Sequence, residues 1–260
     1  MRVLAISSQV AWGPVGLTAA VPALQAKGHE VVAVPTITLS NHPGHGRPAG
    51  FRTAPDDLAA MLGALDGLGV LGRCDAVLTG YFAAPEQVET VRSVLVRMKQ
   101  ARPGLRLVVD PVIGDNGSLY VAQPIASAIR DGLLPLASCI TPNAFELAWL
   151  SGLPVTDEAE AAAAARHLGL AEVLATSIPD GTDHLATLVV TPDATHRHHA
   201  ARLTGVPHGT GDFLGGLYLA ARLEHAPGAA LADAMATLDH AIAISAGSPV
   251  LNVAGALRGA

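Results

Sequence analysis

Lysine, cysteine and aromatic residues are scarce in this chain of 260 residues. The only lysines are Lys27 and Lys99, and the net charge is −6 at pH 7. Nucleic-acid binding needs a basic face, so this balance argues against nucleic acid as a partner, although a local anion site for a nucleotide is compatible with it. Cys74 and Cys139 lack metal-ligand spacing, and we expect both to be buried thiols in a reducing compartment.

Long apolar runs are also missing. No apolar stretch of about 18 residues occurs without polar interruption, which argues against a membrane span. The first apolar strand begins at Arg2 and leaves no room for a signal peptide. We therefore expect a cytoplasmic protein without a membrane partner.

The common phosphate-binding loops are absent as well. The chain has no Gly-x-x-x-x-Gly-Lys-Ser/Thr loop, and Gly13-Pro14-Val15-Gly16 has the wrong spacing for a dinucleotide fingerprint. The remaining candidate is Gly209-Thr210-Gly211-Asp212, which precedes an apolar helical stretch. Glycines at a helix start let backbone N–H groups converge on an anion, and an aspartate there suits a general base beside a transferring phosphoryl group. A simple N-cap role for Asp212 remains open at this point.

Short apolar strands alternate with helical patterns along the whole chain. This alternation predicts an α/β fold with a mostly parallel central sheet and helices on both faces, as one domain over residues 1–260. The segment between Pro35 and Pro55 is rich in Pro, Gly, His and Asn and indicates a loop or an edge hairpin. The predicted strands are 2–6, 29–34, 76–79, 105–109, 138–140, 173–176 and 186–191, and the predicted helices are 16–27, 55–68, 85–100, 125–134, 144–150, 157–167, 211–222 and 229–246.

Polar residues follow several of the predicted strands. Asp110 comes after strand 105–109, Asn143 and Glu146 follow strand 138–140, and Thr176 ends strand 173–176. Ligands bind at the carboxyl ends of parallel strands, so these residues predict an active site at one edge of the sheet, and the carboxylates suit Mg²⁺. Two plainer interpretations stay open: Asp110 as a turn residue, and Asn143 with Glu146 as a helix capping box.

Several histidines also cluster in the sequence. His42 and His45 lie three residues apart, but no third metal ligand is visible nearby, so we do not expect a metal site there. The polar stretch with His196, His198 and His199 indicates an edge or lid segment, and His208 precedes the glycine turn.

Seven stretches together resemble the pyridoxal kinases of the ribokinase-like superfamily, over nearly the whole chain. Gly-Thr-Gly-Asp alone marks only the superfamily, whereas the Ser-Asn-His, Thr-Gly-Tyr and Gly-Ser-Leu-Tyr-Val stretches together point to pyridoxal kinases. The stretches are Ile6-Ser7-Ser8-Gln9-Val10 with Gly13 and Gly16, Ser40-Asn41-His42, Leu78-Thr79-Gly80-Tyr81, Asp110-Pro111-Val112-Ile113-Gly114-Asp115, Gly117-Ser118-Leu119-Tyr120-Val121, Ile140-Thr141-Pro142-Asn143-Ala144-Phe145-Glu146 and Gly209-Thr210-Gly211-Asp212.

The resemblance implies a single-domain, ribokinase-like three-layer sandwich that forms a homodimer. It implies transfer of the γ-phosphoryl group of ATP to the 5′-hydroxyl of pyridoxal, and also of pyridoxine or pyridoxamine, in vitamin B6 salvage. The implied roles are Asp212 as base, Gly209, Thr210 and Gly211 as the anion hole, Asp110 and Glu146 for Mg²⁺, Asp110 and Thr141 for K⁺, Asn143, Thr176, Ser177 and Asp110 for ATP, and Ser8, Val15, Leu39, His42, Tyr81, Tyr120 and Asp212 for the substrate.

Three positions depart from the family pattern. Leu17 stands where asparagine usually follows the glycine, Leu39 replaces an aromatic residue, and Pro43 replaces a threonine. These changes leave the phosphoryl-transfer residues intact and put the vitamer preference in question. The alternatives are a hydroxymethylpyrimidine kinase, which typically has cysteine at the place of Asp212, and a non-catalytic carrier of pyridoxal phosphate.

Overall fold

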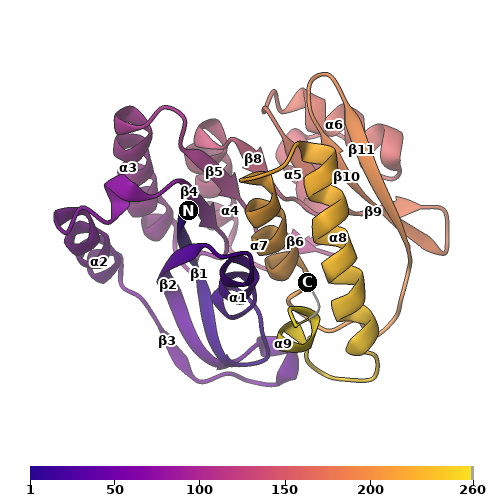
Figure 1. Ribbon diagram of the computed structural model, residues 1–260, viewed down its shortest axis with the longest axis horizontal. Helices are drawn as coiled ribbons and strands as arrows, with labels where there is room; N and C mark the ends of the chain where they lie inside the picture. Colours follow the sequence, from indigo (N-terminus) through magenta and orange to yellow (C-terminus); the bar gives the residue numbers. More distant parts are fainter. Residues whose placement is uncertain (259–260) are drawn as a thin grey trace.

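Nine strands form one sheet in the computed structural model, which describes residues 1–258 (Figure 1). Their spatial order is β11-β10-β9-β8-β5-β4-β1-β2-β3. The pairs from β2 through β1, β4, β5 and β8 to β9 are parallel, and β3, β10 and β11 add antiparallel edges. The strands are β1 (Arg2–Trp12), β2 (Glu30–Asn41), β3 (Gly50–Arg52), β4 (Ala76–Thr79), β5 (Arg106–Val109), β8 (Cys139–Ile140), β9 (Val173–Asp180), β10 (His184–Val190) and β11 (Thr195–Ala201), and β6 (Gly114–Asp115) and β7 (Ser118–Leu119) form a separate small ribbon.

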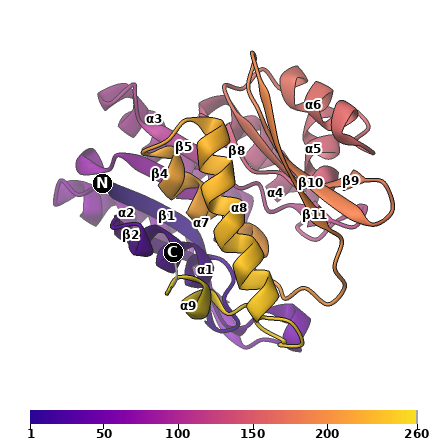
Figure 2. The ribbon, with the colours of Figure 1, turned by 45° about the vertical axis from the view of Figure 1, so that its right-hand side comes forward.

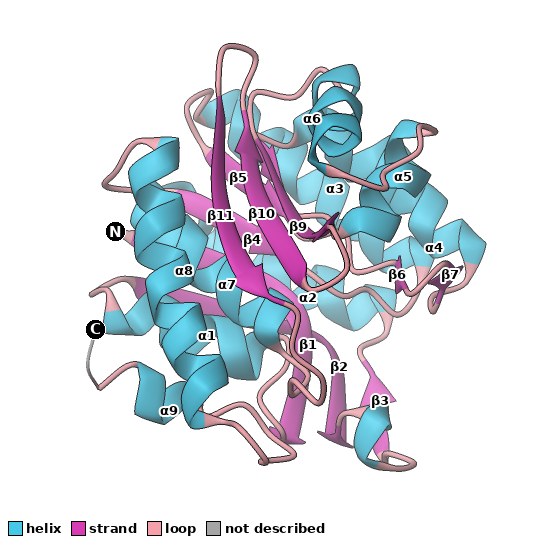
Figure 3. Ribbon diagram, turned by 90° about the vertical axis from the view of Figure 1, so that its right-hand side faces the viewer, coloured by secondary structure: helices cyan, strands magenta, loops and turns pink. Residues whose placement is uncertain are grey.

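Helices cover both faces of the sheet (Figures 2 and 3). Helices α1, α7, α8 and α9 lie on one face and share one apolar core, and α2 to α6 share the other core. The central strands are buried on both faces, which explains their nearly continuous apolar sequences. The helices are α1 (Leu17–Ala26), α2 (Pro55–Gly67), α3 (Pro85–Ala101), α4 (Gln123–Ala128), α5 (Ala144–Ser151), α6 (Glu158–His167), α7 (Thr210–Arg222), α8 (Pro227–Ile244) and α9 (Val253–Ala256).

The first two strands are longer than the apolar pattern predicts. β1 continues past Ile6 to Trp12, and β2 continues past Val34 to Asn41, with a register shift between Ser7 and Ser8. β3 pairs antiparallel with the end of β2, so the loop-or-hairpin segment is an edge hairpin. Its polar residues belong to strands because backbone pairing, and not burial, holds this part of the sheet.

The far edge of the sheet also differs from the prediction. β9 continues past Thr176 to Asp180, and the histidine-rich stretch is the edge strand β11. Polar side-chain contacts hold this strand. The Nε2 of His198 lies 2.9 Å from a carboxylate oxygen of Asp239 on α8, and a guanidinium nitrogen of Arg197 lies 3.7 Å from Glu158 on α6. The predicted helix 125–134 is α4 followed by a π-helical turn.

The predicted fold class is confirmed: one mostly parallel α/β sheet lies between two helical layers. Within residues 1–258, no helix is long and apolar enough to cross a membrane.

Candidate active site

Residues from three connections of the sheet meet at the carboxyl edge of the parallel strands. Asp110 follows β5, Thr141 follows β8, and Asp212 lies in the first turn of α7. Asp110 and Asp212 line one small cavity, together with Ser7, Gly16, Thr79 and Gly80 among others. The sequence-based expectation that these carboxylates converge therefore agrees with the geometry.

Asp212 does not cap its helix. The N-cap of α7 is Gly209, in the left-handed conformation with φ of 97°, and the helix begins at Thr210. The N-cap interpretation of Asp212 is therefore wrong. Burial raises the pKa of the Asp212 carboxyl, and the backbone of Gly16 partly offsets that rise.

The glycine turn packs directly against the loop between β1 and α1. A side chain at position 209 would collide with the carbonyl group of Pro14 and approach Val15 to 3.3 Å. A side chain at position 16 would likewise collide with the backbone carbonyl and hydroxyl of Ser8. These close approaches bring Ser8 and Val15, two predicted substrate residues, to the side of the site where Asp212 lies.

The Asp110 carboxyl lies close to two other carboxyls. Burial raises the pKa of its carboxyl well above the usual value, and the charges of Glu146 and Asp212 raise it further. The buried Thr141 hydroxyl faces Asp110 and lowers its pKa, but completes no hydrogen bond with any described residue. Three carboxyls and one orphaned hydroxyl make a donor set that fits a cation.

Glu146 and Asn143 form the capping box of α5, which confirms the capping interpretation of this pair. The Asn143 side chain accepts a hydrogen bond from the Glu146 N–H at 2.9 Å, and Glu146 accepts one from the Asn143 N–H at 3.0 Å. The Asn143 side chain also donates to the Gly114 carbonyl at 2.8 Å. Its polar atoms are therefore engaged within the protein, and its predicted contact with ATP stays a prediction.

The second carboxylate oxygen of Glu146 holds the loop that follows Asp110. It accepts hydrogen bonds from the N–H groups of Ile113 at 2.8 Å and Gly114 at 3.4 Å. This loop contains Val112 with φ of 41°, a conformation that β-branched residues rarely adopt. Burial raises the pKa of Glu146 to about 7, although these N–H groups favour its ionised form. Glu146 thus maintains a strained loop beside Asp110.

The other predicted substrate residues surround the same edge. The Tyr81 N–H donates to the Ser7 hydroxyl at 3.1 Å, which places Tyr81 beside the cavity. The Tyr120 side chain is 57% exposed, and its phenol lies near Asp110, Glu146 and Asp212, where partial desolvation and these charges raise its pKa. The structure places Leu39 on β2 and His42 at the cap of the short turn Pro43–His45.

Thr176 and Ser177 lie within β9. Thr176 pairs with Asn143 across a parallel bridge, and its N–H donates to the Pro142 carbonyl at 2.8 Å, which keeps it at the carboxyl edge. Ser177 is exposed with φ of 55°, and β9 has a register shift against β10 here. Their predicted contacts with ATP remain predictions.

The sequence prediction missed two side chains of the cavity wall. Ser7 precedes the predicted Ser8, and Thr79 carries a buried hydroxyl without a hydrogen-bond partner among residues 1–258. A side chain on Gly80 would come within 2.5 Å of the Ser7 hydroxyl, so the small residue is required there. Ser7 and Ser8 lie on either side of the register shift in β1, so simple strand alternation could not have shown which of the two serines faces the cavity.

A three-layer α/β sandwich with a glycine turn and an aspartate at the start of a buried helix defines a small-molecule kinase of the ribokinase-like superfamily. Comparison with known proteins narrows this class. The chain belongs to the phosphomethylpyrimidine kinase family, which it matches over residues 16–254.

Its relatives include many pyridoxal kinases. The chain is 40% identical to the pyridoxine/pyridoxal/pyridoxamine kinase of Bordetella bronchiseptica, over 82% of this chain and 78% of that protein. It is 38% identical to the pyridoxal kinase PdxY of Leifsonia xyli, over 85% of this chain and 80% of that protein. Among solved structures, pyridoxal kinase from Leishmania donovani in complex with ADP and pyridoxine matches with a TM-score of 0.92 and 30% identity, over 99% of this chain and 94% of that one. The resemblance to pyridoxal kinases drawn from the sequence is confirmed.

Proposed function

We propose that this protein transfers the γ-phosphoryl group of ATP to the 5′-hydroxyl of pyridoxal. The observation that carries the proposal is the position of Asp212. It is partly buried in the first turn of α7, directly after the glycine turn, and lines the same cavity as Asp110. Relatives that are 35–40% identical and named as pyridoxal kinases support the same activity. The reaction belongs to vitamin B6 salvage, and we extend it to pyridoxine and pyridoxamine.

Asp212 is the residue that takes the proton of the substrate hydroxyl. Its raised pKa makes it a better proton acceptor than an exposed aspartate, because a base works best when its pKa approaches the working pH. The N–H groups of Gly209, Thr210 and Gly211 stand at the N-terminal end of α7, where the helix dipole favours negative charge. We assign them to the developing charge on the transferred phosphoryl group.

Asp110, Glu146 and Thr141 fit the cations that such a reaction uses. Mg²⁺ neutralises phosphate charge during phosphoryl transfer when it is bound. Asp110 would hold it directly and Glu146 through water, because both carboxylate oxygens of Glu146 already accept backbone N–H groups. The orphaned hydroxyl of Thr141, together with Asp110, would hold K⁺. We also propose that the protein acts in the cytoplasm as a homodimer.

Replacing Glu146 with alanine is expected to raise the Mg²⁺ concentration required for half-maximal activity several-fold. The change removes the carboxylate that accepts the N–H groups of Ile113 and Asn143, so the loop after Asp110 loses its support. The measurement is a Mg²⁺ titration of initial rate at saturating ATP. An exposed control is Glu86→Ala in the first turn of α3. Superimposable titration curves for Glu146→Ala and the unchanged protein would contradict this role.

The decisive experiment for the function compares two substrates. ATP turnover is measured with pyridoxal and, in parallel, with hydroxymethylpyrimidine, each over a range of concentrations. We expect pyridoxal to be the better substrate by kcat/KM. A preference for hydroxymethylpyrimidine would replace the assignment with the related kinase, and binding of pyridoxal phosphate without any turnover would indicate a carrier.

A further inference from the structure

His208, the residue directly before the glycine turn, lies against the loop that connects β2 and β3. Its ring centroid is 4.2 Å from that of His42, with the two rings tilted by 37°, and 5.9 Å from that of His45. Aromatic rings attract one another in offset and tilted arrangements of this kind. Within residues 1–258 the His208 side chain makes no hydrogen bond or ion pair, so ring contact is what joins it to the loop.

The hairpin loop, residues 42–46, is held together by its own hydrogen bonds. Three of its N–H groups donate to acceptors inside the loop at 2.9 to 3.1 Å, among them the Gly44 N–H, which donates to the Nδ1 of His42. The Asn41 side chain donates to the carbonyls of His42 at 3.0 Å and of Gly46 at 3.1 Å. A contact made at His42 therefore positions the whole loop.

The contact between His208 and the hairpin loop leaves no room for a side chain at position 44. A Cβ atom on Gly44 would come within 2.5 Å of the His208 Nε2 and 3.0 Å of the His42 Nδ1, so both rings lie directly against the Gly44 backbone. This close approach, and not the backbone conformation, requires glycine, because Gly44 does not have a positive φ. Gly44→Ala therefore separates the rings from the loop without altering His208 itself.

Like charges do not oppose the contact at neutral pH. Burial lowers the pKa of His42 to about 4, and the neighbouring rings of His208 and His45 lower it as well. The His42 ring is therefore uncharged at pH 7, and the His208 ring packs against a neutral partner.

The segment held by this contact leads directly into the proposed anion hole. Gly209 follows His208, has φ of 97° and is the N-cap of α7. The N–H groups of the glycine turn stabilise developing charge only when their direction is fixed in advance. At the other end of the contact, His42 is a predicted substrate residue. One side-chain contact thus links the predicted substrate side of the site to its phosphoryl side.

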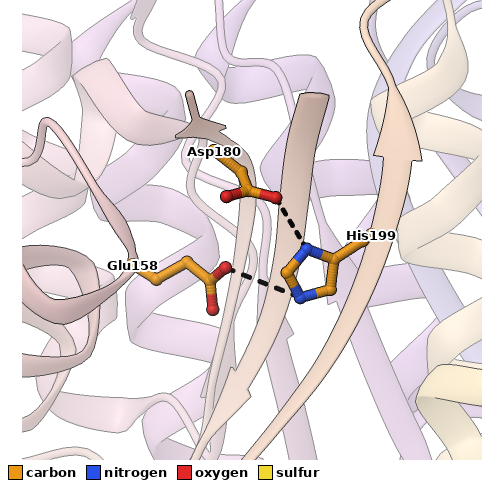
Figure 4. A group of neighbouring side chains, drawn as sticks. All are labelled: Glu158, Asp180 and His199. Atoms are coloured by element: carbon orange, nitrogen blue, oxygen red, sulfur yellow. Dashed lines mark hydrogen bonds and ion pairs between the residues drawn. The ribbon is translucent and has the colours of Figure 1, made fainter. Parts of the chain in front are cut away.

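A second histidine contact supplies a matched control (Figure 4). The two ring nitrogens of His199 lie 2.8 Å from a carboxylate oxygen of Asp180 on β9 and 3.5 Å from one of Glu158 on α6. Like His208, His199 is exposed and joins its own segment to other elements. Its polar contacts among the described residues include none in the hairpin loop or the glycine turn.

We propose that His208 is a positioning residue for phosphoryl transfer: by packing against His42, it holds the hairpin loop and the anion hole in the relative arrangement that the reaction needs. The reaction in this inference rests on the proposed function, whereas the link between the two segments rests on the contacts of His208 themselves. His208 acts through its neighbours and does not touch the reacting atoms.

Replacing His208 with alanine is expected to lower kcat by about 10- to 100-fold, because a misplacement of ~1 Å can cost on the order of 100-fold. The KM for pyridoxal is expected to rise several-fold, since His42 loses its support. A loss of folded protein alone would lower kcat and leave KM unchanged. His208 is exposed and belongs to neither apolar core, so the variant is expected to keep its Tm. His199→Ala is expected to keep both kcat and KM.

Gly44→Ala tests the same contact from the other side. Its methyl group displaces the His208 ring, so kcat is expected to fall and KM to rise as in His208→Ala. In the double variant the closest collision is gone, and Gly44→Ala is expected to add little to the effect of His208→Ala. An equal effect of Gly44→Ala with and without the His208 ring would overturn the proposal.

Hydrogen–deuterium exchange tests the link without any substrate. The hydrogen-bonded N–H groups of the hairpin loop are expected to exchange several-fold faster in His208→Ala and at the original rate in His199→Ala. Unchanged exchange in His208→Ala would overturn the proposal whatever the substrate of the enzyme is. Faster exchange in a protein that does not phosphorylate pyridoxal would refute the proposed function and support the link, and the variants' kcat is then compared on hydroxymethylpyrimidine.

Discussion

Replacing Asp212 with asparagine is expected to lower kcat by about 10²–10⁴-fold, the usual effect of removing a positioned base. Asparagine keeps the shape of the side chain and cannot accept the substrate proton. The anion hole uses backbone N–H groups of Gly209 to Gly211, which this substitution leaves in place. ATP affinity is therefore expected to stay within a few-fold of that of the unchanged protein.

The measurement combines steady-state kinetics with direct titration of ATP. Asp115→Asn is a matched control, because Asp115 is an exposed aspartate at the same edge of the site. It is expected to retain most of the activity. An Asp212→Asn variant with the original kcat would remove Asp212 from the role of base, and a joint loss of kcat and ATP binding would point to a structural role.

Replacing Asp110 with asparagine is expected to stabilise the metal-free protein at pH 8 and to reduce its activity. The pKa values of Asp110, Glu146 and Asp212 are all raised, with burial as the main cause. A carboxyl whose pKa is higher in the folded state stabilises the fold below its unfolded pKa, and this contribution is lost as the pH rises through the folded value. For Glu146 this stabilisation is lost as the pH rises from about 4.5, its ordinary pKa, to about 7, its pKa in the folded protein. Once the pH exceeds these raised pKa values, the carboxylate charges oppose folding unless a cation neutralises them.

Removing one of these charges should raise the free energy of unfolding by on the order of 2 kcal/mol, or about 4–8 °C in Tm for a chain of this size. Thermal unfolding is followed at pH 5 and pH 8, with a chelator and with Mg²⁺. We expect the unchanged protein to lose stability from pH 5 to pH 8 in chelator and to regain it with Mg²⁺, and Asp110→Asn to respond less to both. A lower Tm for Asp110→Asn at pH 8 in chelator would contradict this electrostatic account.

The sequence predicted those parts of the fold in which local pattern and tertiary environment agree. β4 and β5 are buried on both faces, and their apolar sequences marked them almost to the residue. β11 could not be found this way, since its side chains are polar and its partners on α6 and α8 lie far away in the sequence. The extension of β9 through Ser177 escaped for a related reason, because a left-handed serine interrupts the strand pattern.

The site was predictable to a similar degree. The rule that polar residues gather at the carboxyl ends of parallel strands correctly brought Asp110 and Asp212 together. It could not distinguish Glu146 as a ligand from Glu146 as a capping residue, and the structure shows that both its oxygens accept backbone N–H groups. The approach of His208 to His42 depends on how two loops pack, and no local pattern carries that information.

The packing of Gly209 against the Pro14 carbonyl couples the backbone positions of two loops. The loop around Pro14 contains the predicted substrate residue Val15, and the turn at Gly209 begins the proposed anion hole. Neither backbone can shift without pushing the other, so neither segment is a free module for engineering. A transplant of residues 12–16 from a kinase with another vitamer preference would have to bring the matching turn before α7 with it.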